Sequence, residues 1–289
     1  MSTAALELWR RNPRLVGLFK CPAWPDLIGS LDRQIPAYIH FPLKVGLGIG
    51  DAIDTEKSGP ADWQQVEALC ALTGTSQVNL HLSPRAAECP EIPTDVLDAG
   101  AVALVTERLI RDVAAVVTRF GAERVLVENI YDHGGEYLHH ALLPEVIRQV
   151  VETTGCGLLL DLSHARLAAR CLGMDPFDYV QQLPVRQTRE IHITGIQRFD
   201  AGWVERLEQA QVASKVVERF KGRLLDHLPM TPADWHFFAW SMEQVHAGAW
   251  GTPQTVAFEY GGIDSWWAAI TDRDLLASQL AQFGQMIGR

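Results

Sequence analysis

The order of apolar segments along the chain is the feature that most restricts its fold. Eight short β-rich runs alternate with longer segments whose apolar residues recur at helical spacing. Strands that alternate with helices are typical of parallel sheets covered by helices. The predicted strands are residues 15–19, 37–41, 77–82, 124–129, 156–162, 189–194, 223–228 and 255–260. Eight such units predict an α/β fold of the (β/α)8 TIM-barrel type, for which 289 residues suffice.

A doubly wound open sheet is the alternative architecture. That fold usually has a glycine-rich turn after its first strand, whereas Gly46, Gly48 and Gly50 follow the second predicted strand. Their spacing does not match the GxGxxG pattern of dinucleotide-binding proteins. No linker-like stretch divides the chain, so we expect a single domain, 1–289. An inserted helical segment at about 197–222 is expected to form a lid or an interface.

Composition and charge exclude several classes of protein. The chain is 47% hydrophobic, so it is not disordered, and its net charge of −10 disfavours a nucleic-acid partner. No apolar run approaches the roughly 20 residues of a membrane helix, and residues 1–13 contain no apolar signal segment. Five widely spaced cysteines without a Cys-x-x-Cys pair favour free thiols over disulfides or a zinc ribbon. We therefore expect a cytoplasmic protein.

Ionisable side chains recur at the ends of the predicted strands. In a barrel, residues at the carboxyl ends of the strands point into the active site. One such residue alone is more often a core histidine or a helix cap. A converging group of buried carboxylates and imidazoles, however, is costly unless positive charge compensates it. We therefore predict a metal site with eight candidate ligands: His40, His81, Glu128, Asp161, His164, His192, Asp226 and Glu259.

The type and number of these ligands indicate the metal. Imidazoles mixed with carboxylates suit iron, manganese or zinc better than calcium or magnesium. Eight side chains predict two or three ions, bridged by carboxylates such as Glu128. His227 follows Asp226 directly and should point away, so we place it outside the ligand set. Lys20 either holds a substrate carboxylate at the mouth of the site or is a solvated lysine.

One loop near the predicted site is rich in histidine and tyrosine. It follows the fourth predicted strand. It either lines a peptide-binding groove or forms a polar surface, and the sequence favours the second reading. The residues concerned are Tyr131, His133, His139 and His140.

Several motifs resemble those of a known family. The segments TGCGLLLD (154–161), EIHITG (190–195), NLHL (79–82) and FEYGG (258–262) are similar to motifs of multinuclear non-haem iron-dependent oxidases. That family includes the methanobactin-biosynthesis iron enzyme. The segment LLDLSHAR (159–166) also resembles the Asp-x-x-His element of endonuclease IV. Both belong to the xylose-isomerase-like barrel superfamily, and the resemblance covers roughly residues 36–262.

The resemblance implies a particular chemistry. Family members use O₂ at a di- or tri-iron site to modify cysteine residues of ribosomally made peptides. For this chain it implies an iron-dependent oxidase acting on a thiol-containing or peptide substrate, which a partner protein can present. Zinc or manganese in place of iron stays open, since the same ligand types bind all three.

Other functions remain open on the residues alone. A trinuclear zinc site could hydrolyse phosphodiesters as endonuclease IV does, although the acidic balance argues against DNA. A sugar isomerase or epimerase would hold one metal with four of the candidates and leave the rest unused. Those four are Glu128, Asp161, His192 and Glu259. A non-catalytic metal-binding or adaptor protein is a further alternative.

Overall fold

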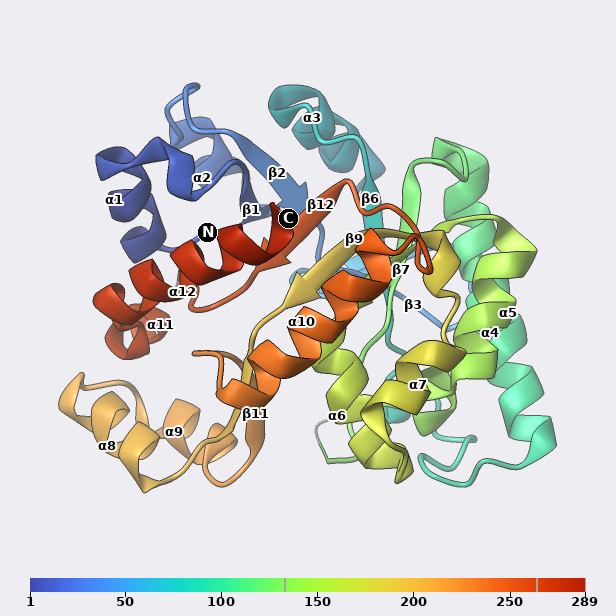
Figure 1. The fold of residues 1–289 in the computed structure, drawn as a ribbon. Coiled ribbons are helices and arrows are strands. Elements are labelled where there is room, and N and C mark those ends of the chain that lie inside the picture. Colours follow the sequence, from blue (N-terminus) through green and yellow to red (C-terminus); the bar gives the residue numbers. More distant parts are fainter. Residues whose placement is uncertain (133, 264, 289) are drawn as a thin grey trace.

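A mostly parallel sheet forms the centre of the protein, and helices cover it (Figure 1). The computed structural model describes residues 1–132, 134–263 and 265–288. The strands are β1 (Phe19–Pro22), β2 (Ala37–His40), β3 (Leu43–Val45), β4 (Ile53–Asp54), β5 (Gly59–Pro60), β6 (Val78–Leu82), β7 (Val125–Glu128), β8 (Gly157–Asp161), β9 (Thr188–Ile193), β10 (Gly195–Arg198), β11 (Leu224–Leu228) and β12 (Thr255–Phe258).

The helices come between these strands, as the alternating pattern predicts. They are α1 (Thr3–Arg11), α2 (Pro25–Ser30), α3 (Trp63–Thr73), α4 (Ala99–Phe120), α5 (Pro144–Thr154), α6 (Leu162–Leu172), α7 (Pro176–Gln182), α8 (Ala201–Gln209), α9 (Ser214–Phe220), α10 (Pro232–His246), α11 (Ser265–Ile270) and α12 (Arg273–Ile287). Helix α1 packs against α12, which brings the two ends of the chain to the same side of the molecule (Figure 1).

The main sheet has the strand order β12-β9-β8-β7-β6-β3-β4-β5. Its strands are parallel from β12 to β3, and β4 and β5 add an antiparallel edge. Strands β1 and β2 form a separate parallel pair. The Asn79 side chain connects this pair to the main sheet, because its Oδ1 accepts from the Phe41 N–H and its Nδ2 donates to the Phe41 carbonyl. A side-chain amide thus replaces part of the backbone ladder between β2 and β6.

The seventh predicted strand does not take its expected place in the barrel wall. Strand β11 pairs antiparallel with β10, and β12 pairs directly with β9. The chain passes from β9 into β10 through Thr194 alone, so β10 offers its edge to β11. Gly195 permits the close approach, because a Cβ there would overlap the carbonyl oxygen of Pro229. The seventh predicted strand therefore lies outside the parallel wall, and the wall itself remains a parallel α/β assembly.

The first strand also begins later than predicted. The sequence pattern predicts a strand over 15–19, but Pro13–Leu15 is a 3₁₀ turn and β1 begins at Phe19. The Asn12 side chain accepts a hydrogen bond from the Arg14 N–H, and a proline at the first position favours the turn. The later start places Lys20 inside β1, opposite Tyr38 of β2.

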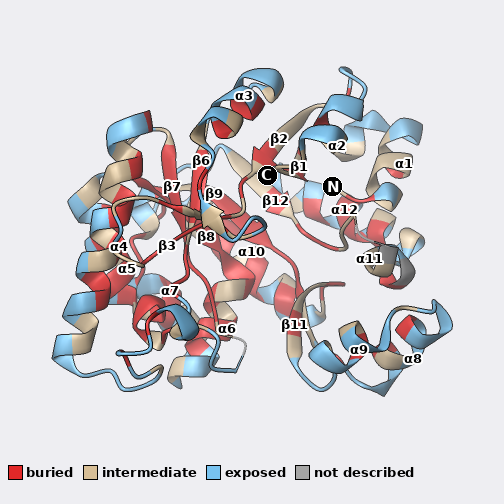
Figure 2. Cartoon of the chain, turned by 180° about the vertical axis from the view of Figure 1, so that it is seen from behind, coloured by how far each residue is buried: buried red, intermediate tan, exposed pale blue. Residues whose placement is uncertain are grey.

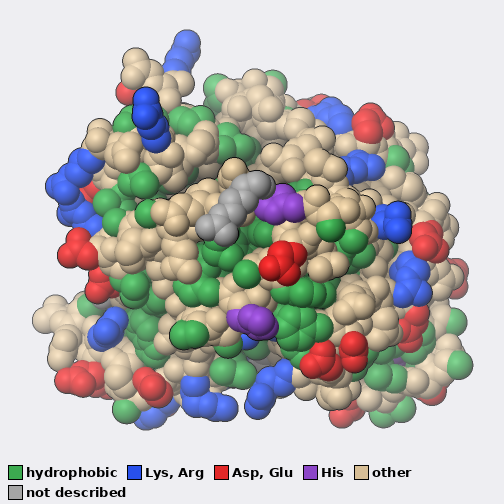
Figure 3. All heavy atoms as spheres, viewed as in Figure 1, with side chains coloured by type: hydrophobic (Ala, Val, Ile, Leu, Met, Phe, Trp, Pro, Cys, Tyr) green, Lys and Arg blue, Asp and Glu red, His purple; other side chains and the backbone are tan. Residues whose placement is uncertain are grey.

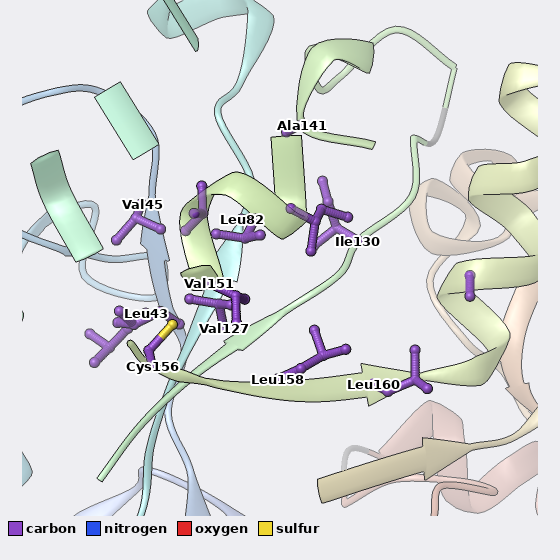
Figure 4. Close-up of a cluster of buried hydrophobic side chains, with 14 of the residues drawn as sticks. Leu43, Val45, Leu82, Val127, Ile130, Ala141, Val151, Cys156, Leu158 and Leu160 are labelled. Atoms are coloured by element: carbon purple, nitrogen blue, oxygen red, sulfur yellow. The ribbon is translucent and has the colours of Figure 1, made fainter. Parts of the chain in front are cut away.

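Apolar side chains fill the space between the strands and the surrounding helices. In Figure 2 the strands are mostly buried, whereas the outer sides of the helices are exposed. The close-up in Figure 4 shows Leu43 of β3, Val127 of β7 and Leu158 of β8 in one cluster with Val151 of α5. The long helix α4 turns a buried stripe toward this core and ends at Gly121, whose φ is 88°.

A buried carboxylate holds the glycine-rich loop after β3. Asp112 of α4 is fully buried and accepts hydrogen bonds from the N–H groups of Gly46, Gly48 and Gly50 at 2.9, 2.9 and 2.7 Å. These glycines have φ values of 122°, 73° and 72°, which favour glycine over other residues. Loops that aim several N–H groups at one point bind anions. Here the Asp112 carboxylate takes the place of a bound anion. This explains why the loop is rich in glycine although its spacing is not that of dinucleotide-binding proteins.

The segment predicted as an insertion packs around a small separate hydrophobic cluster. Trp203 and Leu207 of α8 and Val217 of α9 contact Phe199 and Leu225 there. In Figure 1, α8 and α9 lie at the periphery, beside the β10–β11 hairpin. The insertion therefore supports β11, which carries one of the candidate ligands. Within the described residues, no helix is both long enough and apolar enough to cross a membrane.

Candidate metal centre

The structure brings all eight candidate ligands together at the carboxyl ends of the strands. Strand register aligns them, since His81 lies opposite Glu128 and Asp161 lies opposite His192. They come from β2 (His40), β6 (His81), β7 (Glu128), β8 (Asp161), the first turn of α6 (His164), β9 (His192), β11 (Asp226) and the residue after β12 (Glu259).

Glu128 lies in the middle of this group and is buried. Its Oε2 lies 3.4 Å from His40 Nε2 and 3.2 Å from His81 Nε2. Its Oε1 lies 3.4 Å from His164 Nδ1 and 4.0 Å from His192 Nδ1. Oε2 accepts no hydrogen bond within the described part of the chain. A buried carboxylate between four imidazoles, with one oxygen left unsatisfied, matches the environment of a bridging metal ligand.

Asp161 and Asp226 face His164 from two sides. Asp161 Oδ1 caps α6 by accepting from the His164 N–H at 2.7 Å, and its buried Oδ2 accepts no hydrogen bond from a described residue. His164 Nδ1 donates to the Asn129 carbonyl at 2.9 Å, and its Nε2 lies 3.1 Å from Asp226 Oδ2. Burial alone would lower the pKa of His164, but the carboxylates of Asp161 and Asp226 outweigh it and raise this pKa to about 10.

Backbone contacts and burial prepare His40 and His81 to accept a positive ion. His81 Nδ1 lies 2.9 Å from the Leu43 carbonyl, which can only accept, so Nδ1 carries the proton and Nε2 is free to coordinate. Burial, with the nearby positive charge of Lys20, holds the pKa of His40 well below its usual value. Both imidazoles turn Nε2 toward Glu128.

Glu190 and Tyr38 are site residues that the sequence analysis missed. His192 is fully buried, and its Nε2 donates to Glu190 Oε1 at 2.7 Å. Tyr38 donates its hydroxyl proton to the same oxygen at 2.6 Å. Glu190 thus fixes the His192 tautomer and leaves Nδ1 unprotonated, facing Glu259 Oε1 at 3.2 Å. Glu190 and His192 are two residues apart on one strand and share a face, and that spacing could have revealed the pair.

The structure also places the two residues expected around the ligands. Lys20 Nζ forms an ion pair with Glu259 Oε1 and lies 3.3 Å from His192 Nδ1, so it lies among the ligands and not at the mouth of the site. Burial lowers the pKa of Lys20, while the surrounding carboxylates oppose the change. His227 has φ of 57°, and its Nδ1 lies 2.9 Å from the Glu259 carbonyl, so it supports the backbone of Glu259.

The residues of the histidine-rich loop after β7 lie in two places, some at the metal centre and some in the core. The Tyr131 hydroxyl lies 3.2 Å from Asp226 Oδ1, and its ring lies against that of His164, with centroids 5.1 Å apart. His139 pairs with Asp132, and His140 is buried with its Nε2 2.9 Å from the Val96 carbonyl. Of this loop, Tyr131 alone among the named described residues reaches the ligands. His133 lies outside the described residues.

Within the described residues, six of the eight candidate ligands form three overlapping donor sets, each with its coordinating atoms within 4.8 Å of one another. We call them set A (His40, Glu128, His192), set B (Glu128, Asp161, His164) and set C (Asp161, His192, Glu259). Each pair of sets shares one residue, as expected for ions joined by bridging ligands. The unsatisfied buried oxygens of Glu128 and Asp161 also fit a bound cation. The donors present therefore suit more than one metal ion of the type that prefers nitrogen and oxygen.

We predict that Glu190→Gln weakens metal binding by about 10–100-fold, the usual cost of losing a contact that orients a ligating histidine. The neutral amide would be a weaker acceptor than the carboxylate for the His192 Nε2–H, so the tautomer that frees Nδ1 would be less favoured. Competition titration of the metal-free protein with Zn²⁺ and a coloured chelator measures the affinity. The control is Glu152→Gln at an exposed position of α5, which should leave the affinity unchanged.

Proteins of related sequence align with parts of the chain. A UPF0276 protein of Acaryochloris marina is 30% identical over 92 residues, which are 32% of this chain and 33% of that protein. A UPF0276 protein of Caulobacter vibrioides is 30% identical over 157 residues, 52% of each. The chain thus spans about half or less of the length of these curated relatives.

A solved structure shares the overall fold. A xylose isomerase domain containing protein from Salmonella typhimurium superposes with a TM-score of 0.54 at 12% identity, covering 100% of this chain and 93% of that one. At that identity the likeness concerns the fold alone, and it supports an α/β fold of the TIM-barrel type. The fold class predicted from sequence is thereby confirmed.

A family model gives the most specific match. It covers residues 23–231, which include β2 to β11 and every candidate ligand except Glu259. The family is described as the RiPP precursor modification enzyme MbnB/TglH/ChrH. The motifs that first suggested the resemblance, around Asp161 and His192, lie inside the matched region. The chain belongs to the MbnB/TglH/ChrH family of RiPP precursor modification enzymes.

Proposed function

We propose that this protein is a multinuclear metal-dependent oxidase, with iron as its metal, that modifies a cysteine thiol of a ribosomally made peptide. The observation that carries the proposal is the buried Glu128 shared between donor sets A and B. A single-metal isomerase has no use for such an arrangement. The family match supports a peptide precursor as the substrate.

The exposure of the ligands defines how a substrate approaches. Glu128, Asp161 and His192 are buried and form the floor of the site. His81 keeps 23% of its side-chain exposure, more than any other candidate ligand, so the site opens on its side. A peptide side chain can therefore approach from the side of His81, while the buried floor stays shielded from water.

The chain's own residues prepare the chemistry. Bound iron would supply a Lewis acid for a substrate thiolate and a redox partner for O₂. Glu190 and the Leu43 carbonyl hold the protons of His192 and His81 on the nitrogens that face away from Glu128. His164 Nε2 lies 3.1 Å from Asp226 Oδ2, and this nitrogen can serve set B only when it carries no proton. Tyr131 orients the second oxygen of Asp226.

A nucleic-acid substrate fits the surface poorly. The chain has a net charge of −10, and in the face shown in Figure 3 the Lys and Arg side chains lie mostly toward the rim. A phosphate backbone would need a basic track, so a peptide, which a partner protein can present, suits this acidic chain better.

Metal-loading assays test the proposal. Metal-free protein is loaded with Fe²⁺ or Zn²⁺, and O₂ uptake with cysteine-containing peptides is measured beside cleavage of abasic DNA. We expect O₂ uptake that depends on both iron and the cysteine, since the redox step requires both. A cysteine-to-serine peptide is the control and should give background uptake. Zinc-supported cleavage of DNA without iron-dependent O₂ uptake would instead indicate a hydrolase.

A further inference from the structure

The three donor sets are not equivalent, because one of them already contains a positively charged side chain. Sets A and B share Glu128, sets B and C share Asp161, and sets A and C share His192. In such a triangle each set could hold one ion, and the bridging residue would lie between two ions about 3.5–4 Å apart. The question is therefore whether all three positions are open to metal.

Lys20 reaches into set C. Its Nζ forms an ion pair with Glu259 Oε1 and lies 3.3 Å from His192 Nδ1. These two atoms are 3.2 Å from one another, so the ammonium group lies where an ion held by His192 and Glu259 would have to bind. His192 also belongs to set A, so the sets differ in their unshared ligands. Within the described residues, no lysine or arginine forms a hydrogen bond or ion pair with His40 of set A or His164 of set B.

Lys20 is held in this place by the fold and not by chance contact. It lies in β1, which pairs in parallel with β2, and Tyr38 is its partner in the register. Tyr38 in turn donates to Glu190, which fixes His192. The lysine side chain is partly buried. Moving it away would leave the buried Glu259 carboxylate without its ion-pair partner.

We propose that Lys20 takes the place of one metal ion, so that this centre binds two ions, in sets A and B, and Glu259 serves as the counter-ion of Lys20. This inference rests on the metal centre of the proposed function. It makes Lys20 a positioning residue that sets the number of ions, and it removes Glu259 from the predicted metal ligands. The bridging residue of the two-ion centre is Glu128.

Metal counting tests this directly. Metal-free protein is reconstituted with excess Fe²⁺ under anaerobic conditions, desalted, and its iron is determined by mass spectrometry per mole of chain. Wild-type protein should retain about two iron ions per chain. Lys20→Met keeps the length of the side chain without its charge and should retain about three ions, as in a trinuclear site. Lys20→Arg should stay at about two because it retains the charge. Lys57→Met, an exposed lysine away from the site, is the matched control and should also stay at two.

Glu259→Gln provides a second, independent arm. If Glu259 only neutralises Lys20, the variant keeps about two ions, whereas loss of an ion would show that Glu259 is a ligand. Three ions in the wild type, or two or fewer in Lys20→Met, would overturn the proposal. These counts need no catalytic activity. A two-ion centre without O₂ uptake would contradict the proposed function alone, and an active oxidase with three ions would contradict this inference alone.

Discussion

Glu128→Ala is expected to remove most of the bound metal and, with it, iron-dependent O₂ uptake. Glu128 contributes to two donor sets, so its loss deprives two ions of one ligand each. The decrease in metal affinity should exceed the about 10–100-fold that loss of a supporting contact costs. The apparent kcat should decrease, because protein molecules without metal are inactive. KM should stay unchanged, because it is set by the molecules that still hold metal.

Measurements on the metal-free proteins distinguish loss of metal binding from loss of folding. Glu128 Oε2 accepts no hydrogen bond from the described residues, so the carboxylate adds little to the stability of the metal-free protein. The thermal midpoint of metal-free Glu128→Ala should therefore lie within about 4 °C of the wild type, which corresponds to about 1 kcal/mol. Glu152→Ala at an exposed position should retain both metal and activity. A variant that keeps two ions would contradict the bridging role.

The candidate site was predictable because its residues obey a simple positional rule. Each ligand ends a predicted strand or follows it within a few residues, and parallel strands bring such positions to one edge. The supporting residues Tyr38 and Glu190 were missed although the same rule reaches them. Each lies two residues before a ligand, His40 and His192, and so shares its face of the strand.

The place of β11 could not be predicted from its own residues. Its apolar pattern suits a strand, but the pattern does not say which neighbour the strand will join. That choice depends on Gly195, which lets β10 approach residues 228–229, and on the insertion, which returns the chain antiparallel. Asp226 nevertheless reaches His164, because the β10–β11 hairpin remains next to the wall.

Lys20 shows how a small error in a strand changes the interpretation of a site. With the first strand at 15–19, Lys20 falls in a loop, where a solvated lysine is the simplest reading. The structure begins β1 at Phe19 and pairs Lys20 with Tyr38, which directs the side chain into the centre. The difference arises from the turn at Pro13–Leu15, a local preference stronger than the apolar pattern.

Asp112→Ala is expected to lower the free energy of unfolding by at least about 4.5 kcal/mol, since each of its three hydrogen bonds to a charged group contributes about 1.5–3 kcal/mol. Asp112 satisfies three backbone N–H groups at once, and alanine would leave all of them without that acceptor. Urea denaturation of the metal-free protein measures the loss. Asp98→Ala, which removes a single N-cap bond from the same helix, should cost only about 1 kcal/mol.

The same substitution connects the loop to the metal centre. The loop follows β3, which pairs with β6 at His81, and the Leu43 carbonyl of β3 accepts the hydrogen bond from the Nδ1–H that fixes the His81 tautomer. A loosened loop lets β3 move, so Asp112→Ala should also weaken metal binding, whereas Asp98→Ala should not. Asp112→Asn keeps one acceptor oxygen and should fall between wild type and alanine in stability. A loss below about 1 kcal/mol in Asp112→Ala would show that water can replace the carboxylate in the loop.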